Sequence, residues 1–268
     1  TMLNWSTNKN KVLEIPGYIP TQQGTISGHL KVNGSWLEPG LPVGVWNLLK
    51  TNGVMRTEKE WQDAARVADS NFDKIGDMSF VDKNGDGKIS FGEDRQIVGD
   101  PNPDFIFGWT NNFSYKNFDL SVGTSFQLGG RMRNQFYVSY ALENNNMNLN
   151  NMVKDYWTPE NPTNESAQPG NMGTYRGKAG PWGNQKSDVS HTMSSSDFFR
   201  ITQVTLGYTL PKSWLAGTFL SNVRLYAMLQ NPLLLTADFV YYPEQLTQNV
   251  AGTDFMTTNM IFGVNVSF

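Results

Sequence analysis

Two neighbouring stretches decide the fold of this chain: Phe105–Tyr115 (FIFGWTNNFSY) and Phe118–Leu128 (FDLSVGTSFQL). In both, large apolar side chains occupy most of the alternate positions, while small or polar residues dominate the positions between them. A period of two residues is typical of a β-strand whose faces meet different surroundings. Only the polar pair Lys116-Asn117 separates the stretches. So short a break predicts a tight hairpin.

The same alternation recurs towards the C-terminus, over Val204–Leu210, Val223–Leu229 and Met260–Phe268. Weaker signals predict a further strand around Val43–Val54 and the tail of a strand at Thr1–Ser6. The two clearest stretches are each about 11 residues long, which matches the roughly 9 to 11 residues that a tilted strand needs to cross a bilayer. The pattern therefore predicts about seven antiparallel membrane-crossing strands.

The composition also favours a membrane β-barrel. Charged residues make up 17% of the chain and aromatic residues 13%, with 25 Gly, whereas soluble domains carry roughly 25% charged residues. Barrel strands alternate, so their mean hydropathy stays modest. No run approaches the roughly 18 apolar residues of a transmembrane helix. The net charge of -3 gives no electrostatic reason to expect a nucleic-acid partner.

Connection lengths favour the barrel over its main alternative, a soluble β-sandwich, which also alternates. Short and long connections alternate along the chain. Bacterial barrels show the same alternation, with short turns on the periplasmic side and long loops on the extracellular side. If Thr257–Phe268 runs towards the periplasm, residues 55–104 face outside, Val43–Val54 runs outwards and Thr1–Ser6 runs inwards. Bacterial single-chain barrels close with an even number of strands, so seven crossings predict further strands upstream.

One long connection contains a sequence typical of a calcium loop, DKNGDGKISFGE at Asp82–Glu93. It satisfies the pattern D-x-[DN]-x-[DN]-G-x5-E. Oxygen ligands from Asp82, Asn84, Asp86, the Lys88 carbonyl and Glu93 suit a hard cation such as Ca²⁺. The alternative is a plain Asn/Asp/Gly turn, because these residues also hydrogen-bond their own backbone.

The flanks of this loop differ from those of an EF-hand. Upstream, Thr57–Asp69 (TEKEWQDAARVAD) has helical character, with Thr57 and Glu60 as a capping box. Downstream, Arg95–Asp104 holds Gly and Pro at a density that no helix accepts. We therefore expect a calcium-ordered surface loop and not a calmodulin-like sensor.

The residues Gly76–Gly130 closely resemble the SusC/RagA-like family of TonB-dependent outer-membrane transporters of Bacteroidetes. The resemblance continues, in order, through STNKNKV (Ser6–Val12), YWTPENPTN (Tyr156–Asn164), DFFRITQVTLGYTLP (Asp197–Pro211), VRLYAMLQNPLLLT (Val223–Thr236) and the C-terminal GVNVSF. It implies an all-β fold, the C-terminal part of a 22-stranded antiparallel transmembrane β-barrel with long extracellular loops. Residues 1–268 would supply about seven of these strands. The plug domain and the earlier strands would lie outside this chain.

The same resemblance implies function, location and partners. It implies TonB-dependent uptake of oligosaccharides, peptides or similar nutrients through a barrel in the outer-membrane lipid, capped by a SusD-like surface lipoprotein. TonB would act through the N-terminal part. One departure concerns the metal loop: the family places the last acid directly before Arg at the twelfth position, whereas here Glu93 is twelfth and Asp94 precedes Arg95. Either carboxylate can close the site.

Enzymatic chemistry finds no support in the residues. The chain has no Cys and only two distant His, which excludes a thiol enzyme and leaves Ser residues without a positioned base. Aromatic residues in the predicted extracellular loops are candidates for stacking on sugar rings or on the partner lipoprotein, with loop packing as the alternative: Trp157, Tyr175, Trp182, Tyr241 and Tyr242. We expect a non-enzymatic importer, with a secreted calcium-binding β-sandwich module as the alternative.

Overall fold

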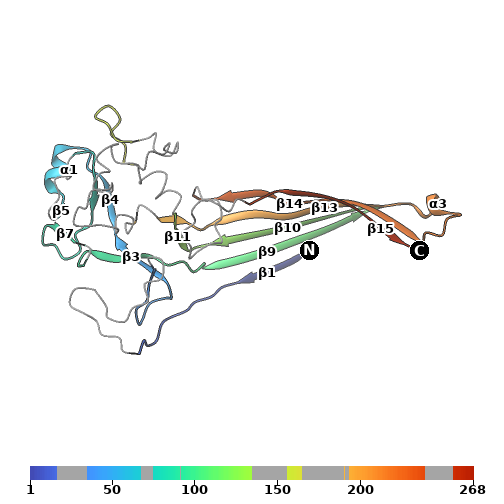
Figure 1. The fold of residues 1–268 in the computed structure, drawn as a ribbon, viewed down its shortest axis with the longest axis horizontal. Coiled ribbons are helices and arrows are strands. Elements are labelled where there is room, and N and C mark those ends of the chain that lie inside the picture. The colour runs from blue at the N-terminus through green and yellow to red at the C-terminus, as the bar shows by residue number, and fades with distance from the viewer. Residues whose placement is uncertain are drawn as a thin grey trace.

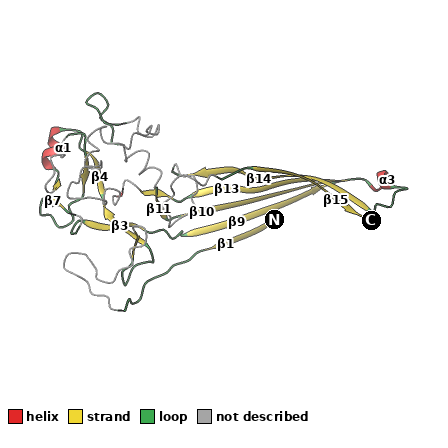
Figure 2. Cartoon of the chain, viewed as in Figure 1, coloured by secondary structure: helices red, strands yellow, loops and turns green. Residues whose placement is uncertain are grey.

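A computed structural model describes residues 1–16, 35–67, 75–90, 92–134, 156–164, 190, 193–238 and 256–268. The molecule is elongated: a long sheet extends from a cluster of short strands and one helix, which gather at one end (Figure 1). Strands dominate the described part of the chain (Figure 2). No helix among these residues is long and apolar enough to cross a membrane.

The long sheet has six strands, and every neighbouring pair is antiparallel. Its central hairpin is β9 (Phe105–Tyr115) and β10 (Phe118–Leu128), joined at Lys116-Asn117 as predicted. The full order across the sheet is β1 (Met2–Ser6), β9, β10, β13 (Phe198–Thr209), β14 (Asn222–Thr236) and β15 (Asn259–Ser267). Each strand except β1 and β15 therefore has a partner on both sides.

The strand register separates the apolar and the polar residues onto opposite faces of this sheet. Phe118 lies opposite Tyr115 on one neighbouring strand and opposite Tyr208 on the other, and its ring lies 4.6 Å from that of Tyr208. One position further along, Asp119 lies opposite Ser114. Directly opposed residues share a face, so aromatic and aliphatic side chains line one face while Ser, Thr, Asn, Gln and Gly dominate the other.

The apolar face is uncovered in the described residues. Phe113 is 58% exposed, Leu206 50% and Phe262 73%. Apolar surface on this scale marks a face that meets another apolar phase. The described residues place no second sheet against it, because the remaining strands form small sheets at one end of the molecule. The β-sandwich alternative is therefore not supported.

The strands β13 and β14 extend further than the sequence pattern predicted. The prediction ended the second of them at Leu229, before Asn231-Pro232, yet β14 continues to Thr236. The register shifts between Ile201 and Gln203 on the partner strand, and Asn231 has a φ of 49°. This irregularity accommodates Pro232, which lacks an amide hydrogen for the ladder.

The prediction of a crossing strand at Val43–Val54 is wrong. This stretch forms two short strands at the loop end, β3 (Val45–Leu49) and β4 (Thr51–Val54). β3 lies between β2 (Ser35–Trp36) and β8 (Arg95–Gly99), while β4 pairs with β6 (Met78–Phe80). Successive residues of β3 are buried, Val45 and Trp46 among them, so both faces of this strand meet protein.

The position and direction of β1 follow from this correction. Because no crossing strand intervenes, β1 pairs directly with β9 and runs antiparallel to it. Thr1–Ser6 therefore runs in the direction opposite to the predicted one. Within the described residues the sheet has six strands instead of about seven, and none of them comes from between β1 and β9 in the chain.

The loop-end cluster has a small core of its own. Trp46, Leu48 and Met193 pack together, with Val98 against them. The indole Nε1 of Trp46 donates a 2.7 Å hydrogen bond to the carbonyl of Arg131. The last residue belongs to β11 (Arg131–Arg133), which pairs with β12 (Met193–Ser195). This contact ties the cluster to the segments that extend the hairpin.

The helix of this cluster is shorter than predicted. α1 spans Glu58–Asp63, and Ala64 is already extended. The chain then forms β5 (Arg66–Val67), which pairs in parallel with β7 (Lys88–Ile89). The predicted cap at Thr57 is confirmed, since its hydroxyl accepts the amide N–H of Glu60 at 3.2 Å. Pairing with β7 thus replaces the predicted helix at residues 66–67, while residues 68–69 of that prediction lie outside the described part of the chain.

Candidate functional site

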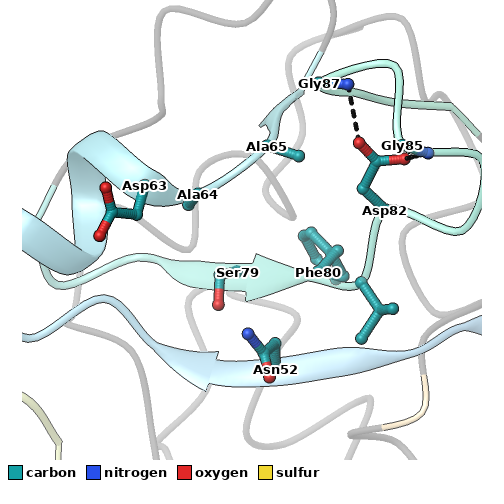
Figure 3. A pocket seen from close by; sticks show the side chains of 10 residues that line it. Asn52, Asp63, Ala64, Ala65, Ser79, Phe80, Asp82, Gly85 and Gly87 are labelled. Atoms are coloured by element: carbon teal, nitrogen blue, oxygen red, sulfur yellow. Dashed lines mark hydrogen bonds between the residues drawn. The ribbon is translucent and has the colours of Figure 1, made fainter.

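The predicted calcium loop lies at the loop end of the molecule, after β6 and around β7 (Figure 1). Its first ligand candidate, Asp82, holds the turn in place. One carboxylate oxygen accepts the amide N–H of Gly85 at 2.6 Å, and the other accepts that of Gly87 at 2.7 Å (Figure 3). Both glycines have a positive φ, 76° and 79°. Gly is the residue that adopts this conformation without steric cost.

The next two candidates, Asn84 and Asp86, contact residues that are nearer to them in the sequence. The side-chain oxygen of Asn84 accepts the amide N–H of Asp86 at 3.1 Å, and an oxygen of Asp86 accepts the amide N–H of Lys88 at 2.8 Å. These are the self-contained turns that Asn and Asp favour. Both side chains stay exposed to solvent.

Glu93 and Asp94, the two acids that sequence alone left as alternatives, occupy different surroundings. Asp94 is fully buried, and its carboxylate accepts the amide N–H of Lys83 at 3.0 Å and that of Ser90 at 2.6 Å. Glu93 is exposed and accepts a hydrogen bond from the amide of Asn84 at 3.3 Å. Asp94 therefore ties the two ends of the loop together, whereas Glu93 lies on the side of the other ligand candidates.

The donor chemistry fits a hard cation, because the candidate side chains offer oxygen alone. Carboxylate and amide oxygens of Asp82, Asn84, Asp86 and Glu93 come from one short loop and border solvent. Among the residues that the structure describes, however, no three acidic or histidine side chains converge as a metal-holding group. The fit is therefore one of donor type and sequence spacing.

A polar groove of about 460 Å³ borders this loop. Its walls come from the end of α1, from the paired strands β4 and β6 and from the loop itself (Figure 3). Asn52, Asp63, Ser79 and Asp82 supply its polar groups. A second hollow of about 290 Å³ continues along α1, where Asn164 joins the lining. The side-chain oxygen of Asn164 accepts the amide N–H of Val54 at 2.8 Å.

At the α1 end of this second hollow, Arg56 and Glu60 form an ion pair. A guanidinium nitrogen of Arg56 lies 2.9 Å from a carboxylate oxygen of Glu60, and the other carboxylate oxygen accepts the Arg56 amide N–H at 2.6 Å. The side-chain hydrogen bond from Arg56 is the main cause that lowers the pKa of Glu60 below its usual value. The pair is about half exposed, so its energetic contribution is small.

The aromatic residues proposed as substrate or partner contacts are mostly beyond what the structure describes. Tyr175, Trp182, Tyr241 and Tyr242 lie outside the described residues. Trp157 is described and is only 7% exposed. Its indole is buried within the chain, so any stacking on a ligand stays a prediction for this residue too.

Sequence reasoning did not assign roles to several residues that build these features. Asn164 was part of the stretch Tyr156–Asn164 that carried the family resemblance, but its anchoring of β4 across more than a hundred residues has no local signal. Asp119 and Arg224 likewise form an ion pair across the polar face, with Nε to Oδ1 at 2.9 Å. Each lies off the apolar stripe of its strand, which predicted its face but not its partner.

Long antiparallel strands with one apolar and one polar face, joined to a loop-rich cluster at one end, define a segment of a membrane β-barrel wall. Solved structures agree: the RagAB peptide transporter matches with a TM-score of 0.70 at 18% identity, covering 99% of this chain and 26% of that one. The RagAB peptide importer in its "open-open" state matches with a TM-score of 0.67. The fold is thus that of the matching part of RagAB, and the sheet described here is not closed.

Curated relatives then specify the family. TonB-dependent receptor P3 of Formosa agariphila is 30% identical over 88% of this chain, and receptor P26 of the same organism is 31% identical over 87%. TonB-dependent receptor SusC of Bacteroides thetaiotaomicron is 30% identical over 64% of the chain. No family profile matches the chain. By sequence and fold the chain belongs with the SusC/RagA-like TonB-dependent receptors, and it spans about a fifth of the length of these curated relatives, between 16% and 22%.

Proposed function

We propose that this chain is part of the barrel wall of a TonB-dependent importer that brings nutrients across a bacterial outer membrane. The two-faced six-stranded sheet carries the proposal: its apolar face suits lipid and its polar face suits a water-filled lumen. The relatives above are named as receptors, and the solved structures as transporters or importers of peptides. A non-enzymatic role accords with both.

The proposal extends to the arrangement of the whole protein. Residues 1–268 are the C-terminal portion of a larger barrel, whose plug and earlier strands lie elsewhere in the polypeptide. A SusD-like lipoprotein covers the loop end, and TonB acts through the N-terminal part. The small share of each relative that this chain matches supports the larger size. Oligosaccharides, peptides and similar nutrients all remain candidates as the substrate.

The proposal also includes a Ca²⁺ ion in the loop Asp82–Glu93. Its ligands are Asp82, Asn84, Asp86, the carbonyl of Lys88 and Glu93. Of the two alternatives for the last ligand we choose Glu93, because Asp94 holds the loop backbone instead. The burial of Asp94 behind two backbone N–H donors supports this choice. The ion orders the loop that borders the polar groove.

Import is tested with the full-length protein in its native host. Deletion of the gene should abolish growth on the nutrient that the protein imports, and growth should return with the wild-type gene but not in a strain lacking TonB. Fractionation should place the protein in the outer membrane. A protein found only in the periplasm or the medium, or growth that does not depend on TonB, would contradict the proposal.

Calcium binding is tested separately from import. Tb³⁺ luminescence should report a site in the full-length protein that Ca²⁺ displaces, and Glu93→Gln should weaken it while Glu58→Gln, an exposed acid of α1, should not. Hydrogen exchange around Asp82 should rise when chelator is added. An exchange pattern that chelator leaves unchanged would rule out the calcium site without affecting the import proposal.

A further inference from the structure

The end of the sheet opposite the loop cluster carries exposed aromatic residues. It consists of the turn at Lys116-Asn117 and of residues 210–221, which contain α3 (Lys212–Leu215) (Figure 1). We call this part of the molecule the α3 rim. Trp214 is 67% exposed and Phe219 82%. Tyr115 and Phe118, which flank the turn, are 71% and 51% exposed.

Backbone hydrogen bonds hold the pieces of the rim together. The carbonyl of Asn117 accepts the amide N–H of Thr209 at 2.9 Å, which places the turn beside the start of residues 210–221. The amide N–H of Ser221 donates to the carbonyl of Ser267 at 2.8 Å. That bond brings Phe268, 88% exposed, to the same end. The exposed rings therefore lie together at one end of the sheet, where its strands begin and end.

The side-chain charges of the rim are all positive. Lys116 and Lys212 are the ionisable side chains of its two connections. Neither ammonium group has an ion-pair partner within the described residues, and that of Lys116 lies 5.4 Å from the centre of the Tyr115 ring. The nearest acid in sequence, Asp119, is already paired with Arg224. The loop end differs, because Asp82, Asp86 and Glu93 are accessible there.

We propose that the α3 rim binds a layer of anionic phospholipid headgroups. Exposed Trp, Tyr and Phe side chains are typical of the boundary between hydrocarbon and headgroups, where an aromatic body meets a wet surface. Lysines beside them can extend their ammonium groups to phosphate while their stems remain in apolar surroundings. Positive charge with exposed aromatic surface fits an anionic leaflet better than it fits free water.

The inference rests on the proposed membrane location and adds lipid selectivity to it. A basic residue near an anionic membrane surface contributes about 1 kcal/mol, which corresponds to roughly a fivefold change in affinity. The rim should therefore hold phosphatidylglycerol more tightly than phosphatidylethanolamine. Loss of one lysine should reduce this preference about fivefold, and loss of both should reduce it further.

The experiment uses the full-length protein in detergent micelles to which phosphatidylethanolamine and phosphatidylglycerol are added. Native mass spectrometry measures the affinity for phosphatidylglycerol of the wild type and of Lys116→Gln/Lys212→Gln. Two controls accompany it. Lys9→Gln/Lys11→Gln makes the same charge change on exposed lysines away from the rim, and Lys116→Arg/Lys212→Arg keeps the charge.

The expected result is a loss of phosphatidylglycerol affinity in the Gln variant of the rim alone. An equal loss in the Lys9/Lys11 variant, or no loss in either, would overturn the proposal. Outer-membrane fractionation of all variants separates this failure from failure of the proposed function. If the wild type is absent from the outer membrane, the location is wrong; if it is present but the rim variant binds as the wild type does, only the lipid site is wrong.

Discussion

At the scale of single residues, the two adjacent acids at the end of the calcium-like loop have opposite roles. Asp94 points inwards and satisfies two backbone donors, while Glu93 stays in contact with solvent and with Asn84. A buried carboxylate that loses its hydrogen bonds leaves its donors unsatisfied, which costs more than the bonds themselves contribute. The two residues should therefore be separable by mutation.

Asp94→Asn should destabilise the loop by about 2 kcal/mol, since hydrogen bonds to a charged group contribute about 1.5 to 3 kcal/mol each and Asn can still accept one of the two. Hydrogen exchange of the Lys83 and Ser90 amides in the full-length protein measures this directly. Glu93→Gln is the matched control: with chelator present throughout, so that loss of a Ca²⁺ ligand has no effect, it should leave both amides as protected as in the wild type. Equal effects from the two variants would contradict the assigned roles.

A second residue-scale prediction concerns Gly207, which lies beneath the ion pair on the polar face. A Cβ placed there would come within 2.4 Å of both the Arg224 guanidinium and the Asp119 carboxylate. Gly207→Ala should therefore displace the pair; because the contacting atoms are the ends of flexible side chains, which can move, the cost should be about 1 kcal/mol, the lower end of the range for overpacking. Thermal unfolding in detergent measures the loss.

The control for Gly207 is a double-mutant cycle. In an Asp119→Ala/Arg224→Ala background the long side chains are gone, so Gly207→Ala should cost much less than in the wild type. If Gly207→Ala costs the same with and without the ion pair, the cost of the added methyl group does not arise from that pair.

At the scale of elements, prediction succeeded where a strand separates two unlike phases. The alternation gave the bounds of β9 and β10 because each side chain on those strands meets either the apolar or the polar side. It failed at β3, where Val45, Trp46, Leu48 and Leu49 are all buried, because a strand covered on both faces loses the two-residue period. The end of α1 was missed for another reason: the residues after it form β5, whose pairing partner, β7, lies more than twenty residues further along the chain.

The site divides in the same way. Loop chemistry at Asp82, Asn84 and Asp86 could be recognised because turn-forming residues act on their immediate neighbours. The groove beside them could not, since its walls come from α1, β4 and β6, which meet only in the folded chain. The anchoring of β4 by Asn164 belongs to the same class of long-range contact.

The helix α1 allows a prediction of pH dependence. Glu60 has a lowered pKa in the folded protein, chiefly because Arg56 hydrogen-bonds its ionised form. Its contribution to stability is therefore complete above the unfolded pKa of about 4.3 and is lost as the pH falls through the lower, folded value. Acidification should lower the protection factor of the Trp61 amide, its exchange rate relative to the intrinsic rate at the same pH; this amide donates to the Thr57 carbonyl at 3.0 Å.

Arg56→Ala tests the cause of this pH dependence. The protection factor of the Trp61 amide should be lower in the variant than in the wild type at neutral pH and should change less with acid, because the Glu60 of the variant no longer titrates from a lowered pKa. The effect should be modest, since the pair is exposed and screened by solvent. A wild type and a variant with the same response to acid would assign the pH dependence to another group.

At the scale of the whole molecule, the sheet has two free edges and an uncovered apolar face in its described part. β1 and β15 each pair on one side, and side chains such as Phe262 and Val264 are exposed. A long apolar edge strand invites association with other chains. Both features require surroundings other than water.

Residues 1–268 expressed alone should therefore associate or precipitate in detergent-free buffer. Analytical ultracentrifugation measures the size distribution, and detergent should shift it towards smaller species. The full-length protein in detergent is the control and should be monodisperse. A folded, monodisperse 268-residue chain in plain buffer would contradict the barrel assignment and favour a soluble module.

The direct pairing of β1 with β9 has a further consequence for how such a protein can diversify. Ser6 and Ile106 lie opposite each other, so everything from residue 7 to residue 104 departs from and returns to a single pair of neighbouring strands. An insertion with adjoining ends can grow, shrink or be exchanged without shifting the pairing of any other strand. Evolution can thus remodel the calcium-like loop and its groove for a new ligand while the wall beneath them keeps its register.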